Sequence, residues 1–287
     1  YDGLRMVFHI KKSSNDSYMT LDNSISGGIE IVEAKGDDRD SRYAFALRDA
    51  HERMDVSSLY YKDSMSRFWV YVIDEEEIVV CFLINHMISD ATSVNILQTA
   101  LLMLYQDPDR TDLPAPGSFA EFMKRRAALH RSRAGRESGK YWAHRMDAYN
   151  SPEIPKLDED AQEGAATFRP LVFSAEKMRK IAKACKTSNF NVFYMLWQLA
   201  LAELCGQADI ALRFTYAGRN TTADQQMIGM LVHGITERSD FRVGLSWRSL
   251  MDEHKKLVDE DMKHVDTADI VHVDDFVMSY LLKDMSS

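Results

Sequence analysis

The sequence predicts an α/β protein of two lobes, and three observations carry this prediction. Strand-like and helical segments alternate through the first half of the chain. A polar, acidic stretch divides the chain near its middle, and the second half again combines strand-like segments with amphipathic helices. A length of 287 residues suits one large domain or two medium ones, and the 45% apolar composition excludes a disordered chain.

The first half opens with strand-like segments. Residues 4–10 form an apolar run, and residues 43–54 have the spacing of a helix. Residues 67–73 and 78–84 are rich in β-branched and aromatic side chains, and four acidic residues separate them, which predicts an antiparallel hairpin. Because every residue of 78–84 is apolar, we expect this strand to be buried on both faces.

A helix follows this hairpin and ends near Tyr105. Asp90, Thr92 or Ser93 is expected to cap its N-terminus. Its expected buried face consists of Val94, Leu97, Leu101 and Leu104. A charged amphipathic helical region is predicted over residues 119–142.

The division into lobes follows the change in composition. We predict an N-terminal lobe over residues 1–150, a linker over 151–168 and a C-terminal lobe over 169–287. The expected elements of the second lobe are a strand at 171–173, helices at 174–186 and 192–205, and a strand at 210–216.

Composition excludes several classes of function. The chain carries 35 basic and 44 acidic residues, a net charge of −9, which argues against a nucleic-acid binder. The longest apolar run, residues 78–84, is too short to cross a membrane. Three cysteines in apolar surroundings suggest a reducing compartment, and the first residues lack the pattern of a signal peptide. We therefore expect a cytoplasmic protein, and no Cys/His spacing predicts a metal site.

One short motif could carry chemistry. His86 follows the second strand of the hairpin directly and precedes a helix, so its imidazole is placed to act as a general base near neutral pH. Asp90, four residues later, lies in an apolar neighbourhood and needs a cationic partner there. By itself this pattern is also typical of a structural histidine.

Further segments extend the pattern along most of the chain. They are residues 1–8 (YDGLRMVF), 85–91 (NHMISDA), 119–122 (FAEF), 141–142 (YW), 216–219 (YAGR), 228–233 (IGMLVH) and 264–266 (HVD). In this order they resemble the motifs of the condensation domains of nonribosomal peptide synthetases, a family that shares its fold with chloramphenicol acetyltransferase. The family's first motif and its last strands and helices have no counterpart, so the second lobe is expected to be incomplete.

The resemblance implies a fold and a function. The fold would consist of two chloramphenicol acetyltransferase-like lobes, each a mixed sheet with helices, which form a V-shaped pseudodimer. An acyl or peptidyl thioester on one carrier domain would be joined to the amine of an aminoacyl thioester on another, which forms an amide. The domain itself would bind no cofactor, because both substrates travel on phosphopantetheine arms. The implied partners are upstream and downstream carrier domains and an adjacent adenylation domain.

The resemblance also implies roles for single residues. His86 would be catalytic, and Asp90, Arg5, Asn85, Ala91 and Ser93 would shape the active site. A second group would line the tunnel or seam between the lobes: Tyr216, Gly218, Arg219, Gly229 and His233. We expect Asp90 to pair with Arg5, because both lie in apolar surroundings within matched motifs.

Three departures from the family pattern keep other functions open. Asn85 stands in place of the first histidine, Ala91 in place of a glycine and His233 in place of an asparagine. One alternative is a catalytically silent, condensation-like docking platform, and another is an ester-forming acyltransferase. Heterocyclising relatives are disfavoured because His86 is present, and epimerising relatives because Thr215 stands where they carry a glutamate.

Overall fold

The computed structural model describes residues 1–10, 17–25, 28–54, 65–155, 174–241, 246–270, 273 and 275–278. Two compact units divide the chain. Unit 1 consists of Tyr1–Ala127 and Gly218–Val232, and unit 2 of Ala128–Ala217 and His233–Ser287. The division thus falls at Ala127, not at the predicted position 150, because the helical region continues past the first unit. The predicted linker lies mostly outside the described residues, and the predicted strand 171–173 lies entirely outside them.

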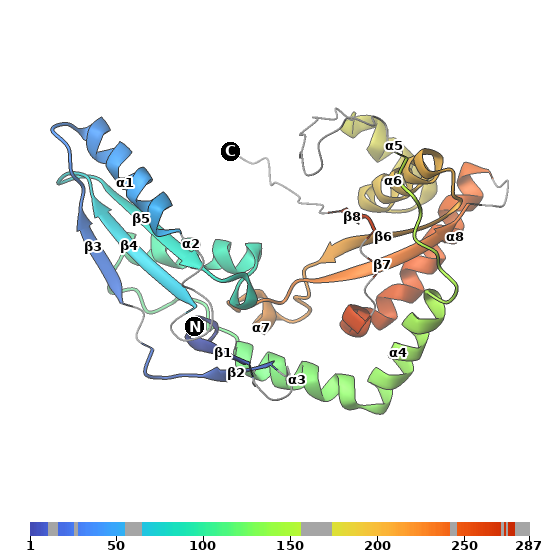
Figure 1. The fold of residues 1–287 in the computed structure, drawn as a ribbon, viewed down its shortest axis with the longest axis horizontal. Coiled ribbons are helices and arrows are strands. Elements are labelled where there is room, and N and C mark those ends of the chain that lie inside the picture. Colours follow the sequence, from blue (N-terminus) through green and yellow to red (C-terminus); the bar gives the residue numbers. More distant parts are fainter. Residues whose placement is uncertain are drawn as a thin grey trace. The chain divides into compact units, whose positions relative to one another are not determined.

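Unit 1 contains a small antiparallel ribbon and a three-stranded mixed sheet (Figure 1). Strand β3 pairs in parallel with β4, and β4 pairs antiparallel with β5, which confirms the predicted hairpin and the mixed sheet of this lobe. The elements of the unit are η1 (Gly3–Arg5), β1 (Met6–Ile10), β2 (Ser17–Leu21), β3 (Ile29–Glu33), α1 (Arg39–Arg53), β4 (Ser66–Val72), β5 (Ile78–Ile84), η3 (His86–Ile88), α2 (Ala91–Gln106) and α7 (Thr222–Gln225). Helix α3 (Phe119–Arg131) begins in this unit.

Helix α1 covers one face of the three-stranded sheet. Asp38 caps it by accepting a hydrogen bond from the amide of Ser41, and the Ser41 hydroxyl completes a capping box. Ala46 and Ala50 face the sheet and are almost fully buried. Because these side chains are small, the helix lies close to Trp69 and Tyr71, which form the core of this layer.

The other face of the sheet is largely exposed. Ile29 and Ile31 on β3 are 59% and 69% exposed, and Ile78 and Val80 on β5 are 39% and 45% exposed. The prediction that β5 is buried on both faces was therefore wrong. An apolar strand can be buried on both faces, but its sequence does not show whether another element packs on the second face.

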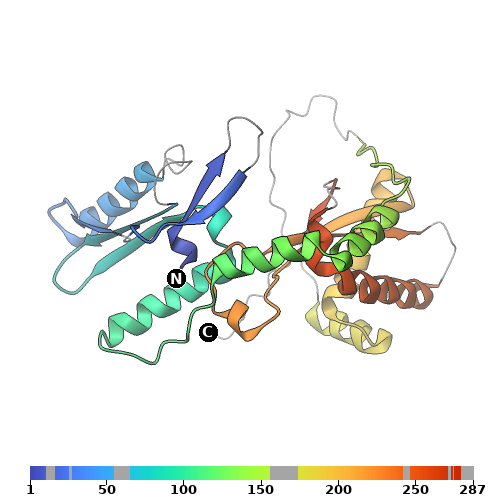
Figure 2. The ribbon, with the colours of Figure 1, turned by 90° about the horizontal axis from the view of Figure 1, so that it is seen from below.

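Asp90 is the N-terminal cap of helix α2, the teal helix of unit 1 in Figure 2. The predicted helix and its cap are thus confirmed. Its buried residues are Ser93 and Leu97, whereas Leu104 is 36% exposed. The predicted buried face was therefore wrong at its C-terminal end.

Unit 2 is also built on a mixed sheet, in which β6 pairs antiparallel with β7 and in parallel with β8. Its elements are α4 (Arg133–Arg145), α5 (Ala175–Cys185), α6 (Asn189–Cys205), β6 (Asp209–Tyr216), β7 (His233–Asp240), α8 (Trp247–Asp261), η4 (Met262–Ile270) and β8 (Val277–Met278). The predicted region 119–142 is two helices, because Ser132 ends α3 and its hydroxyl caps α4. None of the helices among the described residues has the length and apolar character that a membrane span requires.

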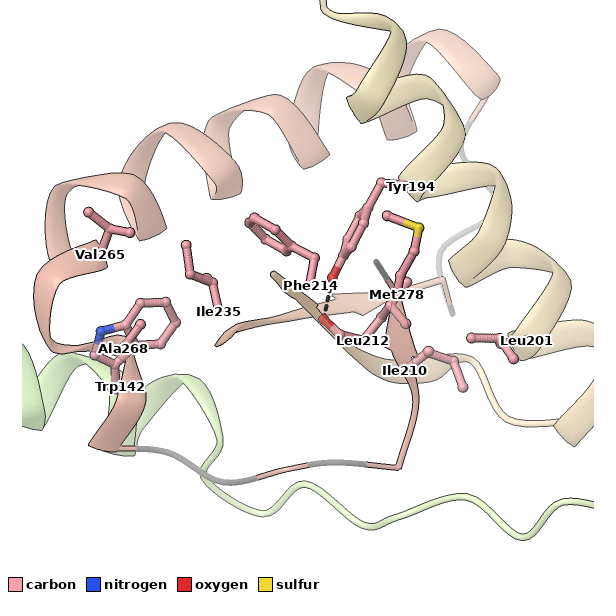
Figure 3. Packing of buried hydrophobic residues seen from close by; sticks show 10 residues of the cluster. All are labelled: Trp142, Tyr194, Leu201, Ile210, Leu212, Phe214, Ile235, Val265, Ala268 and Met278. Atoms are coloured by element: carbon pink, nitrogen blue, oxygen red, sulfur yellow. Dashed lines mark hydrogen bonds between the residues drawn. The ribbon is translucent and has the colours of Figure 1, made fainter. Parts of the chain in front are cut away.

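The core of unit 2 lies between its sheet and its helices. Tyr194 on α6 is fully buried and donates a hydrogen bond to the carbonyl of Leu212 on β6 (Figure 3). Trp142 on α4 is also fully buried, and its indole N–H donates to the carbonyl of His264 over 3.0 Å. These two aromatic anchors satisfy their polar atoms while they fill the core.

Several ionisable side chains are buried in the same unit. Asp261 is fully buried and accepts two hydrogen bonds from Arg145, over 3.0 and 3.1 Å. Glu237 is 2% exposed, and neither of its carboxylate oxygens has a hydrogen-bond partner among the described residues. Burial, reinforced by the charge of Asp261, raises the pKa of Glu237 well above its usual value despite the opposing effect of Arg145. Glu237 is therefore buried as the neutral acid.

This burial predicts a specific dependence of stability on pH. The folded state holds a proton on Glu237 that the unfolded state releases above about pH 4.3, so this side chain contributes less stability as the pH rises. We expect Glu237→Gln to gain stability relative to the wild type between pH 5 and pH 8, by up to about 1.4 kcal/mol per pH unit. Urea unfolding at each pH measures the difference.

The exposed Glu203 of α6 offers a matched control. Glu203→Gln should differ from the wild type by a constant amount across the same pH range. Equal slopes for Glu237→Gln and Glu203→Gln would contradict a neutral Glu237. Because only differences between variants are compared, the opposite contribution of His254, whose pKa burial lowers to about 4, cancels.

Candidate functional site

His86 lies on a short, well-anchored turn. It is the first residue of η3, which follows β5 and precedes α2. Its neighbour Ile88 is fully buried in a cluster that includes Met6, Phe119 and Leu231. The His86 side chain itself is exposed, and it makes no hydrogen bond or ion pair with any residue that the structure describes. The turn therefore holds the imidazole at the surface of unit 1, with its ring nitrogens available.

Asp90 forms a buried ion pair, but its partner is Arg219. The Nη2 atom of Arg219 lies 2.7 Å from Oδ1 of Asp90, and the two side chains are 6% and 5% exposed. The expected pairing with Arg5 was therefore wrong: the Arg5 guanidinium donates to Asn23 over 2.7 Å instead. Both Arg5 and Arg219 belong to matched motifs, and sequence alone did not show which of them reaches the carboxylate.

The same carboxylate connects two segments of unit 1, the start of α2 and residues 218–232. Its Oδ1 accepts hydrogen bonds from the amide and the hydroxyl of Ser93, both over 2.8 Å. Its Oδ2 accepts from the amide of Leu231 over 3.2 Å. The Nη1 atom of Arg219 donates to the carbonyls of Asp224 and Met227. Because each of these bonds to a charged group is strong when buried, segment 218–232 is fixed against the start of α2.

Ser93 and Gly229 complete this network. Ser93 Oγ lies 3.0 Å from Nη2 of Arg219, and it accepts from the amide of Gly229 over 3.1 Å. Its own proton has two acceptors within reach, Asp90 Oδ1 and the carbonyl of Gly229 at 2.9 Å. A Cβ atom on Gly229 would collide with the ring of Phe119, so only glycine allows this close approach.

Asn85 and Ala91, two of the departures from the family pattern, lie at helix starts. Asn85 caps η3, because its Oδ1 accepts from the amide of Met87 over 2.9 Å. Its backbone amide donates to the carbonyl of Met65, also over 2.9 Å, which fixes the end of β5. Ala91 is the first residue of α2 and is exposed. An amide side chain therefore supports the His86 turn without a titratable group.

Asp2 has a structural role that the sequence did not suggest. Its carboxylate accepts from the Ser118 hydroxyl over 2.6 Å and from the amides of Phe119 and Ala120 at the start of α3. Burial alone would raise the pKa of Asp2, but these hydrogen bonds lower it on balance. A capping aspartate usually lies next to its helix in sequence, so no local signal identified one 117 residues away.

Two predicted residues lie in unit 2. Tyr216 ends β6 and His233 begins β7, and their rings meet edge to face with centroids 5.4 Å apart. Nε2 of His233 lies 3.0 Å from the carbonyl of Val265, so this nitrogen carries the proton. Gly218, with φ of 65°, belongs to unit 1 together with Arg219 and Gly229. That these residues line a tunnel or seam stays a prediction.

The arrangement combines an exposed imidazole with a rigid, buried support. A neutral imidazole accepts a proton from a substrate and later returns it, and a fixed turn keeps it in one orientation. The described residues contain no cluster of three His, Cys, Asp or Glu side chains arranged to hold a metal ion.

Comparisons with known proteins point to one family. Residues 1–268 match the family model for the condensation domain. Among curated proteins the chain is similar to bacitracin synthase 1 of Bacillus licheniformis, with 24% identity over 74% of this chain. That match covers 4% of the synthase, so the chain corresponds to a small part of such a protein.

Solved structures show the same fold. The chain is similar to a condensation domain that mediates chain release from the enacyloxin polyketide synthase, with a TM-score of 0.72, 20% identity and coverage of 92% of this chain and 51% of that one. It is also similar to the X-domain in its complex with OxyB from teicoplanin biosynthesis, with a TM-score of 0.70, 14% identity and coverage of 94% and 61%. The predicted acetyltransferase-like fold is thus confirmed.

The ion pair leads to a prediction about stability. Asp90→Ala and Arg219→Ala should each lower the free energy of unfolding by about 3–5 kcal/mol, because each leaves the other charge buried without its partner. Arg5→Ala should cost less than about 1 kcal/mol, since among the described residues the Arg5 guanidinium bonds to the exposed Asn23 and to no carboxylate. Urea unfolding followed by circular dichroism measures all three values. A loss for Arg5→Ala equal to that for Arg219→Ala would contradict the assignment.

Proposed function

The chain belongs to the condensation-domain family, and from this premise we propose that it forms an amide bond between two carrier-bound substrates, with His86 at the reaction centre. The observation that carries the proposal is the exposed imidazole of His86, which has no partner among the described residues and lies on a turn fixed by the buried Asp90–Arg219 pair. The proposed donor is an acyl or peptidyl thioester, and the proposed acceptor is the amine of an aminoacyl thioester.

The proposed reaction is an acyl transfer. The acceptor amine attacks the thioester carbonyl, a C–N bond forms, the C–S bond breaks, and the sulfur leaves as a thiol. A ring nitrogen of His86 takes the proton that the amine loses and passes it to the departing sulfur. An α-amine has a pKa of about 8, so much of it is already unprotonated near neutral pH. Positioning of the amine by His86 therefore contributes beside proton transfer.

The proposed partners follow from the reaction. Upstream and downstream carrier domains present both thioesters on phosphopantetheine arms, and an adjacent adenylation domain loads the acceptor. The protein itself supplies no cofactor in this scheme, and we place the reaction in the cytoplasm. The proposed roles fall to side chains of unit 1: His86 moves the proton, and the network around Asp90 holds the turn in place.

A docking platform without catalysis is the second candidate. One structure with this fold is an X-domain in complex with OxyB, so the fold occurs in a complex with another protein. Asn85 and Ala91 depart from the condensation pattern beside His86, which favours this candidate. Ester formation is the third, with a hydroxyl in place of the amine.

A carrier-loaded assay tests the proposal. With acyl and aminoacyl thioesters on carrier proteins, the wild type should form an amide, and His86→Ala should lower the rate at least about 100-fold through loss of its proton transfer and positioning. Mass spectrometry identifies an amide, an ester or no product. His51→Ala, which replaces an exposed histidine of α1, is the matched control and should keep the rate. An unchanged rate in His86→Ala would contradict the proposed mechanism.

Asn85 allows a second test, of how the turn supports His86. Asn85→Ala removes the cap of η3 and should lower kcat several-fold with little change in KM, because the imidazole loses its fixed orientation. Asn85→Asp keeps an acceptor for the amide of Met87 and should retain most of kcat. Equal losses in both variants would show that the cap does not position His86.

A further inference from the structure

A cavity of about 250 Å³ runs along one side of α2. Six residues of the helix line it at helical spacing: Thr92, Asn95, Ile96, Thr99, Ala100 and Met103. Leu113 and Pro114, in the loop after the helix, contribute to its lining. All of these residues belong to unit 1, so the cavity lies within a single compact unit.

The lining excludes charged ligands. Most of it consists of hydrocarbon, and its polar members, such as Thr99 and Gln226, are neutral. Among the described residues that line it, Tyr1 carries the one ionisable side chain, and burial raises the pKa of its phenol further above neutrality. A charged group would lose its hydration here without gaining a partner of opposite charge. The cavity therefore suits a neutral, mainly aliphatic group.

Its dimensions indicate an elongated group. Thr92 and Met103 are eleven residues apart, which corresponds to about 16 Å along a helix. A volume of about 250 Å³ spread over that length is narrow, and it is less than the roughly 300–1,000 Å³ of sites that hold a whole drug-sized molecule. A hydrocarbon chain or a long aliphatic side chain fits these limits better than a ring system.

The cavity begins at the first turn of α2, the helix that follows the His86 turn. Thr92 is two residues after Asp90, the residue that caps α2 and holds Arg219. Gln226 lies in segment 218–232, which the same ion pair fixes. One rigid network thus holds both the His86 turn and two sides of the cavity.

We propose that this cavity binds the aliphatic acyl chain of the donor thioester, a proposal that rests on the amide-forming function of His86. The thioester carbonyl lies near His86, and the chain extends along α2 between the helix and the loop at Leu113. Discrimination between donors of different length then comes from burial of methylene groups in the cavity.

Two substitutions on α2 test this assignment. Ala100→Phe fills the cavity, whereas Leu102→Phe enlarges a side chain that is 57% exposed and does not line it. With decanoyl- and acetyl-loaded carrier as donors, Ala100→Phe should lower kcat/KM for decanoyl at least about tenfold and change that for acetyl less than about twofold. Leu102→Phe should change neither by more than about twofold. Thr99→Phe, at an exposed position that also lines the cavity, repeats the test if Ala100→Phe unfolds.

Binding separates this proposal from the proposed function. Calorimetry with decanoyl- and acetyl-pantetheine requires no turnover, and the wild type should bind the decanoyl compound at least about tenfold more tightly. Ala100→Phe should abolish that preference. Absence of amide formation together with this binding preference would overturn the proposed function and support the cavity. Equal binding of both probes by the wild type, or a preference that survives Ala100→Phe and Thr99→Phe, would overturn the cavity assignment.

Discussion

The buried pair of Asp90 and Arg219 is the constraint on which the rest of unit 1 depends. The two residues are 129 positions apart in sequence, and their charged groups meet at 2.7 Å with almost no exposure to solvent. Desolvation offsets much of the attraction in such a pair, so its contribution is to geometry more than to net stability. One carboxylate caps α2, accepts from Ser93 and Leu231, and binds the guanidinium. No neutral side chain could do all of this.

The pair also explains the path of the chain. Strand β6 ends at Tyr216 and β7 begins at His233, both in unit 2, whereas the segment between them packs in unit 1. Such an excursion costs conformational entropy, and the buried contacts of Arg219 and Gly229 offset that cost. Gly229 is required for the same reason, because a larger residue could not lie against Phe119. The site is thus assembled from segments that sequence distance alone would never connect.

Local signals in the sequence predicted much of the fold, and non-local contacts explain what they missed. The hairpin of β4 and β5, the cap at Asp90 and the helix of Ser174 follow from patterns within a few residues. The partner of Asp90 did not follow, since Arg5 and Arg219 both lie in matched motifs and only packing selects one. The exposure of β5 and the burial of Glu237 on β7 depend on which other elements pack over these strands, and the residues of a strand do not specify that. The cap of α3 by Asp2 is also a non-local contact, so the residues around α3 did not predict it.

The structure separates the reactive group from the groups that hold it. The support of the site is buried and densely hydrogen-bonded, and the Ser93 hydroxyl has more acceptors than protons. The imidazole of His86 is exposed and makes no hydrogen bond or ion pair with any described residue. This division explains how Asn85 can replace a histidine of the family motif. What that position must supply is one acceptor for the amide of Met87, and an amide oxygen meets that need without a second titrating group beside His86. Asn85 therefore differs chemically from the family's histidine but still caps the turn that carries His86.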